Sequence, residues 1–454
     1  MKKFLLGFVA SLAVLIGVAS LAGFPPAYLY SAPAVASGIG AKLLCSARYV
    51  TGFSQQQAFD DLVQYSPILE LLTFEFDEPG GAVTTSLLGL SEKTATYLSG
   101  MGCAIDYAGF GQRAAINTNT VGTRIPTTGN QAWPLGDTVS APDVSMQSLL
   151  ATQVQQDNTL GLNTRALLVL HESKILAEAY AQGTDETTPL LGWSMAKSLN
   201  SIMLGNLELR GKLDLNNVPG FPTWGEDARS QIRISDMLTM TDGLAFSEEY
   251  NPGDDATAML FTVPSTSSYV MEKQAQHAPG TFFNYSSGTA NLLSRLYQET
   301  LGSPQDAYDD YLTNIFDPLG FQNAIFEVDA SGVFVGSSYF YASARDWARI
   351  GQLMLNRGII NGQRLVSEDW IDRATRPNNS ENQRAYGYQW WLNRGNENLR
   401  WRSLPEDAFS AQGNRQQYLM VIPSLQLVII RLGWTAGRYP VNEQFAEIVQ
   451  QVGR

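Results

Sequence analysis

Gly192-Trp-Ser-Met-Ala-Lys-Ser198 is the stretch that decides the fold, because it places Ser194 three residues before Lys197 at the start of an amphipathic segment. The apolar residues that follow recur at helical spacing: Met195, Leu199, Ile202, Met203 and Leu207. Gly211 ends the pattern, so we predict a helix from Ser194 to about Arg210. Side chains three residues apart share one face of a helix, which brings the serine and the lysine together near its N-terminus.

This pair of side chains is suited to nucleophilic catalysis. A serine hydroxyl is a poor nucleophile until a neighbouring base takes its proton, and a lysine at this spacing can do so. Burial and the positive end of the helix dipole both favour the neutral form of Lys197. The outward-facing N–H of Ser194 can donate to a developing oxyanion. The same spacing also occurs in helix caps followed by a solvated lysine, so the assignment depends on partners elsewhere in the chain.

The chain contains two histidines, His171 and His277. Neither lies in the spacing of a zinc site, and neither belongs to a motif of a Ser-His-Asp triad. We predict structural or solvent-facing roles for both, and we expect no metal and no other cofactor. The formal net charge of −13 repels phosphate backbones, so nucleic acid is not an expected partner.

Strand-like segments lie on both sides of the predicted helix in the sequence. Ala166–Leu170 and Ile175–Tyr180 are separated by a short polar turn and predict a hairpin. Gln417–Ile422 and Leu427–Leu432 predict two further strands, followed by a helix with one apolar face. This order predicts an α+β fold in which one antiparallel sheet faces a helical region. A site would lie where the helix at Ser194 meets the sheet.

Two further segments carry residues that would complete a site. Tyr285, in Phe283-Asn-Tyr-Ser-Ser-Gly288, can relay a proton to a leaving group if it lies near the serine and the lysine. The alternative is a core tyrosine on a turn. Ala411-Gln412-Gly413 precedes a strand, and a glycine on an edge strand lets a substrate approach and offers a backbone N–H. The alternative is an ordinary turn.

Together these motifs resemble those of the β-lactamase-related serine hydrolases, over roughly residues 160–454. That family includes class C β-lactamases, D-stereospecific peptidases, esterases and 6-aminohexanoate-dimer hydrolases. The resemblance implies a five-stranded antiparallel sheet flanked by helices, with acylation of Ser194 followed by hydrolysis by water. It also implies that Lys197 and Tyr285 share the proton transfers. Further matching stretches are Met237-Leu-Thr-Met-Thr-Asp-Gly-Leu244, Pro279-Gly-Thr-Phe-Phe-Asn-Tyr-Ser-Ser287, Ala344-Arg-Asp-Trp-Ala-Arg349 and Val428-Ile-Ile-Arg-Leu-Gly433.

Two departures from the family pattern bear on the substrate. Ser287 stands where the β-lactamases have Asn, and Ala411 stands where they have the Lys of K-T-G, so the cation that grips a β-lactam carboxylate is missing. Arg415 is a candidate replacement for that cation, and Ser287 and Tyr250 are candidate substrate contacts. We therefore predict an ester or amide hydrolase that looks most similar to the 6-aminohexanoate-dimer hydrolases. The alternatives are a β-lactamase or D,D-peptidase, and a non-catalytic binding protein on the same fold.

The N-terminus predicts export. Lys2 and Lys3 precede an apolar run, Phe4–Phe24, whose length fits a membrane anchor, whereas the small residues at 32–37 favour a cleaved signal peptide. Either outcome places the rest of the chain in the periplasm, free or anchored to the inner membrane by residues 4–24. In that oxidising space we predict a disulfide between Cys45 and Cys103, the two cysteines of the chain.

These motifs divide the chain into three parts. Residues 1–25 are the signal peptide or anchor, residues 26–150 an N-terminal extension with wrapping loops, and residues 151–454 the hydrolase domain. The loops at 215–275 are expected to shape substrate choice, with Trp224, Tyr250 and Phe261 as pocket or core aromatics. The expected partner is a small ester or amide, and the sequence predicts no particular oligomeric state.

Overall fold

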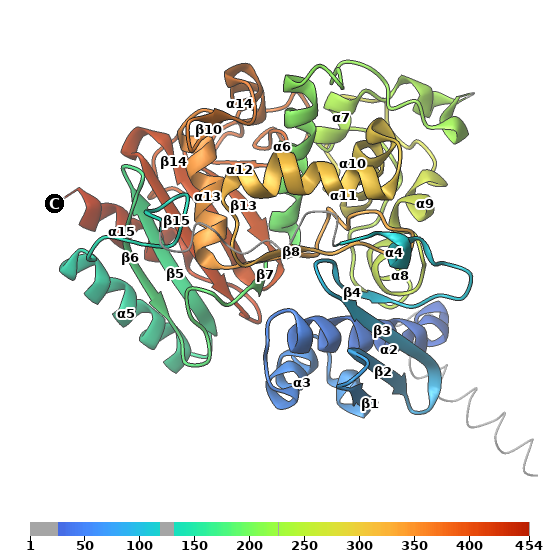
Figure 1. Cartoon of the computed structure of the whole chain (residues 1–454). Coiled ribbons are helices and arrows are strands. Elements are labelled where there is room, and N and C mark those ends of the chain that lie inside the picture. Colours follow the sequence, from blue (N-terminus) through green and yellow to red (C-terminus); the bar gives the residue numbers. More distant parts are fainter. Residues whose placement is uncertain (1–25, 119–130, 226, 454) are drawn as a thin grey trace, which may run out of the picture.

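The predicted strands join in one antiparallel sheet in the computed structural model, which describes residues 26–118, 131–225 and 227–453 (Figure 1). The strand order is β12-β13-β14-β15-β5-β6. The strands are β5 (Thr164–His171), β6 (Lys174–Tyr180), β12 (Trp391–Leu392), β13 (Phe409–Gly413), β14 (Gln417–Ile422) and β15 (Leu427–Gly433). The α+β class is confirmed, but this sheet has six strands where five were predicted. The extra strand, β12, has two residues, too few to give an alternating pattern.

Both faces of this sheet are buried. Leu167 and Val169 of β5 belong to a cluster that includes residues of α5 (Val144–Thr159) and α15 (Val441–Val452). Leu168 and Leu170 belong to the cluster on the opposite face, where α13 (Ala344–Leu355) packs. Successive side chains of a strand alternate between the two faces of a sheet. Burial on both faces therefore explains why β5 reads as a continuous apolar run rather than an alternating one.

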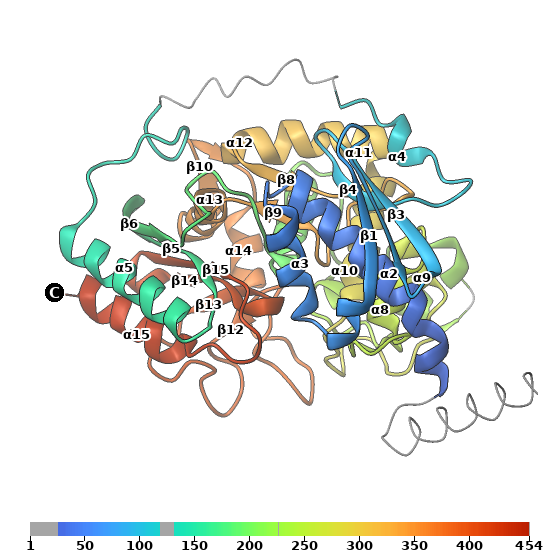
Figure 2. The same cartoon turned by 90° about the horizontal axis from the view of Figure 1, so that it is seen from below.

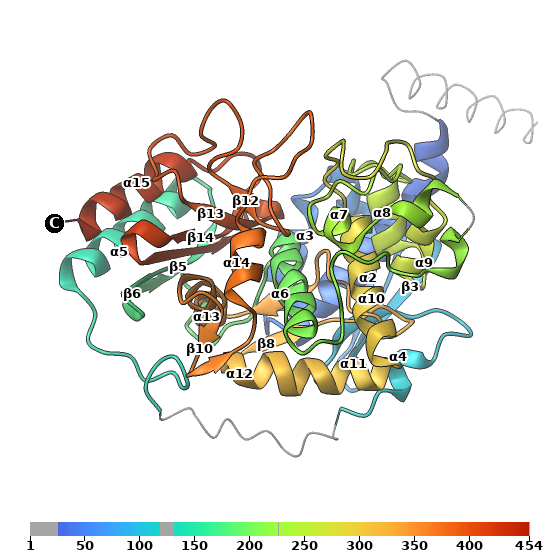
Figure 3. The ribbon, with the colours of Figure 1, turned by 90° about the horizontal axis from the view of Figure 1, so that it is seen from above.

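A helical region lies beside the sheet, and α6 (Ala196–Leu209) lies between the two (Figure 3). The predicted helix is confirmed, with its start shifted: Ser194 lies in a 3₁₀ turn, Trp193–Met195, directly before α6. The other helices of residues 234–374 are α7 (Ile234–Leu238), α8 (Asp255–Phe261), α9 (Thr266–Met271), α10 (Ser287–Leu301), α11 (Pro304–Tyr311), α12 (Asp317–Leu319), α13 (Ala344–Leu355) and α14 (Glu368–Ala374).

Two small sheets complete this part of the molecule. A three-stranded antiparallel sheet has the order β7-β9-β8, and β10 pairs with β11 in a two-stranded one. Their bounds are β7 (Leu190–Leu191), β8 (Ala324–Phe326), β9 (Phe340–Ala342), β10 (Ile359–Ile360) and β11 (Gln363–Arg364). β7 runs directly into the turn that carries Ser194, so this small sheet anchors the entry to the turn.

The N-terminal extension forms a helix-and-sheet unit packed against the helical region (Figure 2). Its long helix, α2, packs on a four-stranded sheet of order β1-β2-β3-β4 and also contacts α8. Gly38 of α2 permits this second contact, because a Cβ there would lie 2.2 Å from the carbonyl oxygen of Phe261. The elements are α2 (Pro26–Tyr49), α3 (Gln55–Val63), β1 (Leu72–Asp77), β2 (Ala82–Leu87), β3 (Leu90–Leu98), β4 (Gly102–Ile105) and α4 (Gln112–Ala115).

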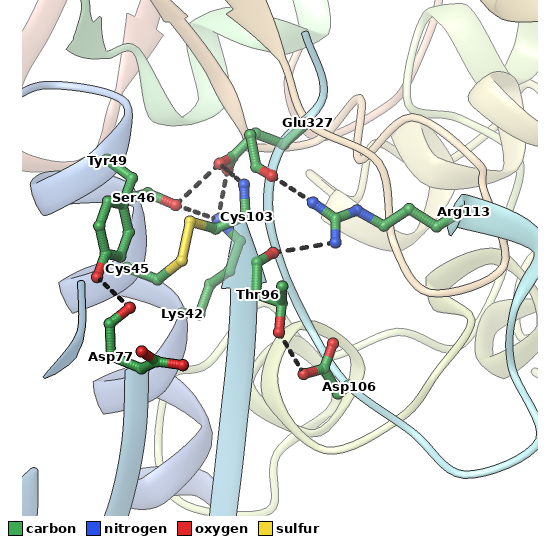
Figure 4. Close-up of a disulfide and its surroundings, with 11 residues drawn as sticks. Lys42, Cys45, Ser46, Tyr49, Asp77, Thr96, Cys103, Asp106, Arg113 and Glu327 are labelled. Carbon is green, nitrogen blue, oxygen red and sulfur yellow. Dashed lines mark hydrogen bonds and ion pairs between the residues drawn. A yellow bond between two sulfur atoms is a disulfide. The ribbon is translucent and has the colours of Figure 1, made fainter. Parts of the chain in front are cut away.

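A disulfide and a buried ion pair hold α2 in place (Figure 4). The predicted bond between Cys45 and Cys103 is present and joins α2 to β4. Next to it, the fully buried carboxylate of Glu327 accepts hydrogen bonds from the Lys42 ammonium, from Ser46 Oγ at 2.8 Å and from the Cys103 N–H at 2.7 Å. Glu327 follows β8, so these bonds tie the extension to the region that follows it in sequence. Leaving either buried charge unpaired would destabilise the fold by about 3–5 kcal/mol.

The predicted signal peptide or anchor, with its apolar run at 4–24, lies outside the described residues. Within the described ranges, no helix combines the length and the apolar character needed to cross a membrane.

Candidate active site

The turn that carries Ser194 has a strained backbone. Trp193 has φ of 48°, a left-handed conformation that is unusual for a bulky residue. Such a residue costs about 1–3 kcal/mol and persists only when its surroundings hold it there. The indole is buried and packs against the rings of Tyr65 and Tyr339. The first hydrogen bond of the turn runs from the Met195 N–H to the Gly192 carbonyl, so the N–H of Ser194 precedes the helical pattern and is free to bind an anion.

Lys197 lies one helical turn further on, and its ammonium contacts three oxygens. Nζ lies 2.9 Å from Ser194 Oγ, 3.0 Å from Ser287 Oγ and 2.9 Å from the Ser337 carbonyl oxygen. The side chain is 1% exposed, and this burial lowers the pKa of Lys197 to about 8, while the charge of Glu248 acts in the opposite direction. A substantial fraction of the side chain is therefore neutral at mildly alkaline pH and can accept a proton.

Glu248 sets the direction of the hydrogen bonds around Lys197. Its Oε2 accepts the Ser287 N–H at 2.7 Å, and its Oε1 accepts the Ser287 hydroxyl at 2.6 Å and the Tyr250 hydroxyl at 3.1 Å. A carboxylate can only accept, so Ser287 gives its proton to Glu248 and must accept from Lys197. The Ser337 carbonyl can also only accept. A neutral lysine has two N–H bonds, and these two partners take both, which leaves its lone pair facing the Ser194 hydroxyl.

Tyr285 lies next to Lys197. Its ring stacks on Trp391 with centroids 5.2 Å apart, and Lys197 Nζ lies 4.8 Å from the Tyr285 ring centroid. Burial raises the pKa of the phenol well above its usual value and the Glu248 charge adds to this, whereas the Ser194 hydroxyl acts in the lowering direction. Tyr285 is therefore protonated near neutral pH and is suited to pass a proton on rather than to start the reaction as a base.

The Ala411-Gln412-Gly413 segment closes the site at the end of β13. The neighbouring strand β12 pairs with Phe409 and Ser410, and no other strand of the described residues pairs with β13 on that side. Gly413 lies against the Ser194 turn: a Cβ there would be 2.1 Å from the carbonyl oxygen of Gly192. Only glycine permits this approach, which brings the end of β13 against the turn that carries Ser194.

Ala411 and Arg415 are the two positions that bear on the binding of a substrate carboxylate. The Ala411 side chain is buried in the core, so it leaves no cation where the β-lactamases have lysine. The guanidinium of Arg415 lies over the ring of Tyr65, 3.9 Å from its centroid, and is buried there. The structure thus brings Ser194, Lys197, Tyr285 and Ser287 together, and it places Arg415 against the N-terminal extension.

The sequence did not predict that Glu248 and Ser337 belong to the site. Glu248 lies in the irregular segment before α8 and reaches the site through a contact between residues 39 positions apart. Its neighbour Tyr250 is the signal that could have found it, since both belong to one short loop. Ser337 contributes a backbone carbonyl, which no residue type specifies.

The two histidines take no part in this cluster. His277 stacks on Phe282 with ring centroids 4.2 Å apart, and His171 ends β5. Among the residues that the structure describes, no group of three or more His, Cys, Asp or Glu side chains is arranged to hold a metal ion.

Comparison with known proteins identifies the family. The profile described as Beta-lactamase matches residues 146–445, well over half of the chain. The chain belongs to the beta-lactamase family. The resemblance predicted from the sequence is confirmed, and with it the class of enzyme, a serine hydrolase. Residues 26–145, which include α2 and β1–β4, precede the part that matches the family.

Individual relatives agree with this assignment. The chain is 26% identical over 297 residues to 6-aminohexanoate-dimer hydrolase of Paenarthrobacter ureafaciens, covering 59% of this chain and 72% of that one. A structure from Bacillus anthracis assigned to the same name superposes with a TM-score of 0.55 at 20% identity, covering 65% and 80% of the two chains. A family VIII carboxylesterase superposes with a TM-score of 0.53 at 13% identity, covering 69% of this chain and all (100%) of that one. The two structures share the beta-lactamase fold with this chain.

Proposed function

We propose that the protein hydrolyses an ester or amide through an acyl-enzyme on Ser194, with Lys197 as the base. The observation that carries the proposal is the set of contacts around Lys197. Ser287 and Ser337 take the two N–H bonds of the neutral amine, and the remaining lone pair faces the Ser194 hydroxyl at 2.9 Å. A nucleophile and its base within hydrogen-bond distance, with the base oriented by further groups, is the arrangement that activates a serine.

In the acylation step, Lys197 takes the Ser194 proton while Oγ attacks the substrate carbonyl carbon. The oxyanion that forms accepts hydrogen bonds from the Ser194 N–H and from the backbone at the end of β13. When the C–O or C–N bond to the leaving group breaks, the proton passes from Lys197 through the Tyr285 phenol to the leaving alcohol or amine. The products are the acyl ester of Ser194 and the free leaving group.

In the deacylation step, water replaces the leaving group and the same residues act in reverse order. Tyr285 and Lys197 take a proton from the water as its oxygen attacks the acyl carbon, and the Ser194 oxygen leaves with a proton returned by Lys197. The step releases a carboxylic acid and restores the serine. Water is the co-substrate of the overall reaction.

The substrate class follows from what surrounds the site. Ala411 is buried and Arg415 lies over Tyr65, so neither supplies a cation for the carboxylate of a β-lactam. The names of two similar proteins, a 6-aminohexanoate-dimer hydrolase and a carboxylesterase, support amide and ester bonds as substrates.

We further propose that the enzyme is exported to the periplasm, and the disulfide between Cys45 and Cys103 supports an oxidising compartment.

The test is covalent labelling with a fluorophosphonate probe, followed by mass spectrometry of the labelled peptide. We expect label on Ser194 of the wild-type protein, none on Ser194→Ala, and labelling of Lys197→Ala slowed at least about a hundredfold. Lys212→Ala is the matched control, since it removes an exposed lysine just beyond α6, and it should label at the wild-type rate. Folded wild-type protein that takes no label at Ser194 would contradict the proposal.

A further inference from the structure

A large cavity lies beside the turn that carries Ser194. Its volume is about 550 Å³, within the range of small-molecule sites. Three of its lining residues adjoin the residues of the active site: Trp193 precedes Ser194, Asn414 follows Gly413, and the Tyr250 hydroxyl is bonded to Glu248. The cavity therefore lies next to residues that flank the place where a substrate carbonyl would meet the serine.

The lining of this cavity is mostly apolar and carries no formal charge; its polar side chains are Tyr28, Tyr65, Ser66, Tyr250, Asn251, Thr257 and Asn414. None of the described residues that line it is Asp, Glu, Lys, Arg or His. Large apolar side chains at its rim, Leu29 and Ile68, are 44% and 39% exposed, as is the Tyr250 ring at 45%. An apolar group that entered here would gain by leaving water, whereas a carboxylate or ammonium would lose hydration without meeting an opposite charge.

The N-terminal extension forms much of this cavity. From α2 come Leu29, Ala32, Val35, Ala36 and Ile39, and from the 3₁₀ turn Pro67–Leu71 come Ile68 and Leu69. The opposite side comes from the segment at 250–261, which includes Tyr250 and Phe261. The extension precedes the part of the chain that matches the beta-lactamase family, so this cavity is a feature that the extension adds to the family domain.

The position of the cavity relative to Tyr285 indicates which part of a substrate it holds. Tyr285 donates the proton to the leaving group, so the leaving group lies on its side of the serine. Tyr285 and its stacking partner Trp391 do not line the cavity. Asn414, which follows Gly413 at the end of β13, does line it. An acyl group that points away from the leaving group across the carbonyl carbon would extend toward the cavity.

We infer that the cavity between α2 and the Ser194 turn binds an uncharged, apolar acyl chain, so that the enzyme prefers esters or amides of medium-length aliphatic or aromatic acids to acetyl compounds. This inference rests on the proposed function for the chemistry at Ser194, and it adds the class of acyl group. The extension is then the element that determines substrate specificity.

The test compares p-nitrophenyl esters from acetate to decanoate. We expect kcat/KM of the wild-type enzyme to rise about fourfold for each methylene until the chain fills the cavity. Ile68→Glu places a charge at the rim and should lower the decanoate-to-acetate ratio at least about tenfold. Leu71→Glu is the matched control, because Leu71 lies in the same 3₁₀ turn, is 52% exposed and does not line the cavity.

A second variant approaches the cavity from α2. Ala32→Trp should fill it and reduce the decanoate-to-acetate ratio, whereas Tyr30→Trp, at a 90% exposed position of the same helix, should not. A wild-type preference for acetate, or ratios unchanged in both cavity variants, would overturn the inference. It would also be overturned if the variants changed selectivity only in a series of alkyl acetates, where the chain belongs to the alcohol.

Failure of the proposed chemistry can be told apart from failure of this inference. Label on Ser194 and hydrolysis of the acetate report the chemistry, independently of chain length. Binding of a dansyl-labelled amide of decanoic acid to Ser194→Ala protein reports the cavity without turnover. In that protein Ile68→Glu should weaken binding and Leu71→Glu should not. Equal binding to both would contradict the cavity assignment even in an active enzyme.

Discussion

Replacement of Glu248 by Gln should move the pH profile of the enzyme. In the mechanism above, neutral Lys197 is the active form, and its pKa is about 8. The wild-type kcat/KM should therefore fall as the pH drops through about 8. The Glu248 carboxylate favours the charged ammonium and so raises this pKa against the effect of burial. Glu248→Gln removes the negative charge, which lowers the pKa of Lys197, and the acidic limb must move to lower pH.

The size of the shift can be worked out from two hydrogen bonds in series. Lys197 Nζ to Ser287 Oγ is 3.0 Å and Ser287 Oγ to Glu248 Oε1 is 2.6 Å, so the two charges lie at most about 5.6 Å apart. At an effective dielectric constant of about 20, that separation corresponds to about 3 kcal/mol, or about two pH units. Glu248 is half-buried, and its contact with water reduces the effect, so we expect a shift of about one to two units.

The assay measures kcat/KM for a p-nitrophenyl ester at pH values from about 5 to about 10, with a correction for spontaneous hydrolysis. We also expect a plateau about three- to tenfold lower in Glu248→Gln, because a lysine with a lower pKa is a weaker base. Glu249→Gln is the matched control: it removes the same charge from the exposed neighbouring residue and should leave the limb in place. An unmoved limb in Glu248→Gln, or an equal shift in both variants, would refute the reasoning.

Two further changes test the backbone approach at β13 and the attachment of α2. Gly413→Ala keeps an allowed backbone conformation, at φ −133°, but its Cβ would lie 2.1 Å from the Gly192 carbonyl oxygen. We expect thermal unfolding to show a loss of about 1–3 kcal/mol in stability. Ester hydrolysis should show a loss of at least about tenfold in kcat. Gly225→Ala, whose nearest neighbour would be 3.7 Å away, should change neither, and a fully active Gly413→Ala would contradict the geometry. The double variant Cys45→Ala/Cys103→Ala removes the disulfide, whose two cysteines are separated by 58 residues. A loop of that length predicts that the free energy of unfolding, measured by urea titration, falls by about 4 kcal/mol. An unchanged titration midpoint would show that the disulfide contributes nothing to stability.

The sequence was most informative where the geometry is local. Ser194 and Lys197 are one helical turn apart, so their meeting follows from helical spacing alone. The hairpin of β5 and β6 could be recognised for the same reason, since a short polar turn joins two apolar runs. Tyr285 and Ser287 needed the motif around them, because the contact of Ser287 with Lys197 spans 90 residues.

The features that escaped prediction depend on long-range contacts or on backbone atoms. Glu248 is one of many acidic residues in an acidic chain, and only the fold brings it to Ser287. Arg415 was a candidate to replace the missing lysine, but the side chain of a residue in the left-handed region points where the turn directs it, here to Tyr65. β12 was missed because two residues carry no periodicity, although its Trp391 supports the Tyr285 ring.

The N-terminal extension reaches both halves of the active site, which explains why it cannot be regarded as an appendage of the family domain. The Tyr65 ring packs edge-on against Trp193, whose strained backbone presents Ser194, and the same ring carries the guanidinium of Arg415, two residues beyond Gly413. One aromatic side chain thus supports both the nucleophile turn and the end of β13, the two segments that supply the N–H groups for the oxyanion in the proposed mechanism. A strained residue keeps its conformation only while its neighbours hold it. Loss of the extension would therefore weaken the chemistry at Ser194 as well as remove the apolar cavity.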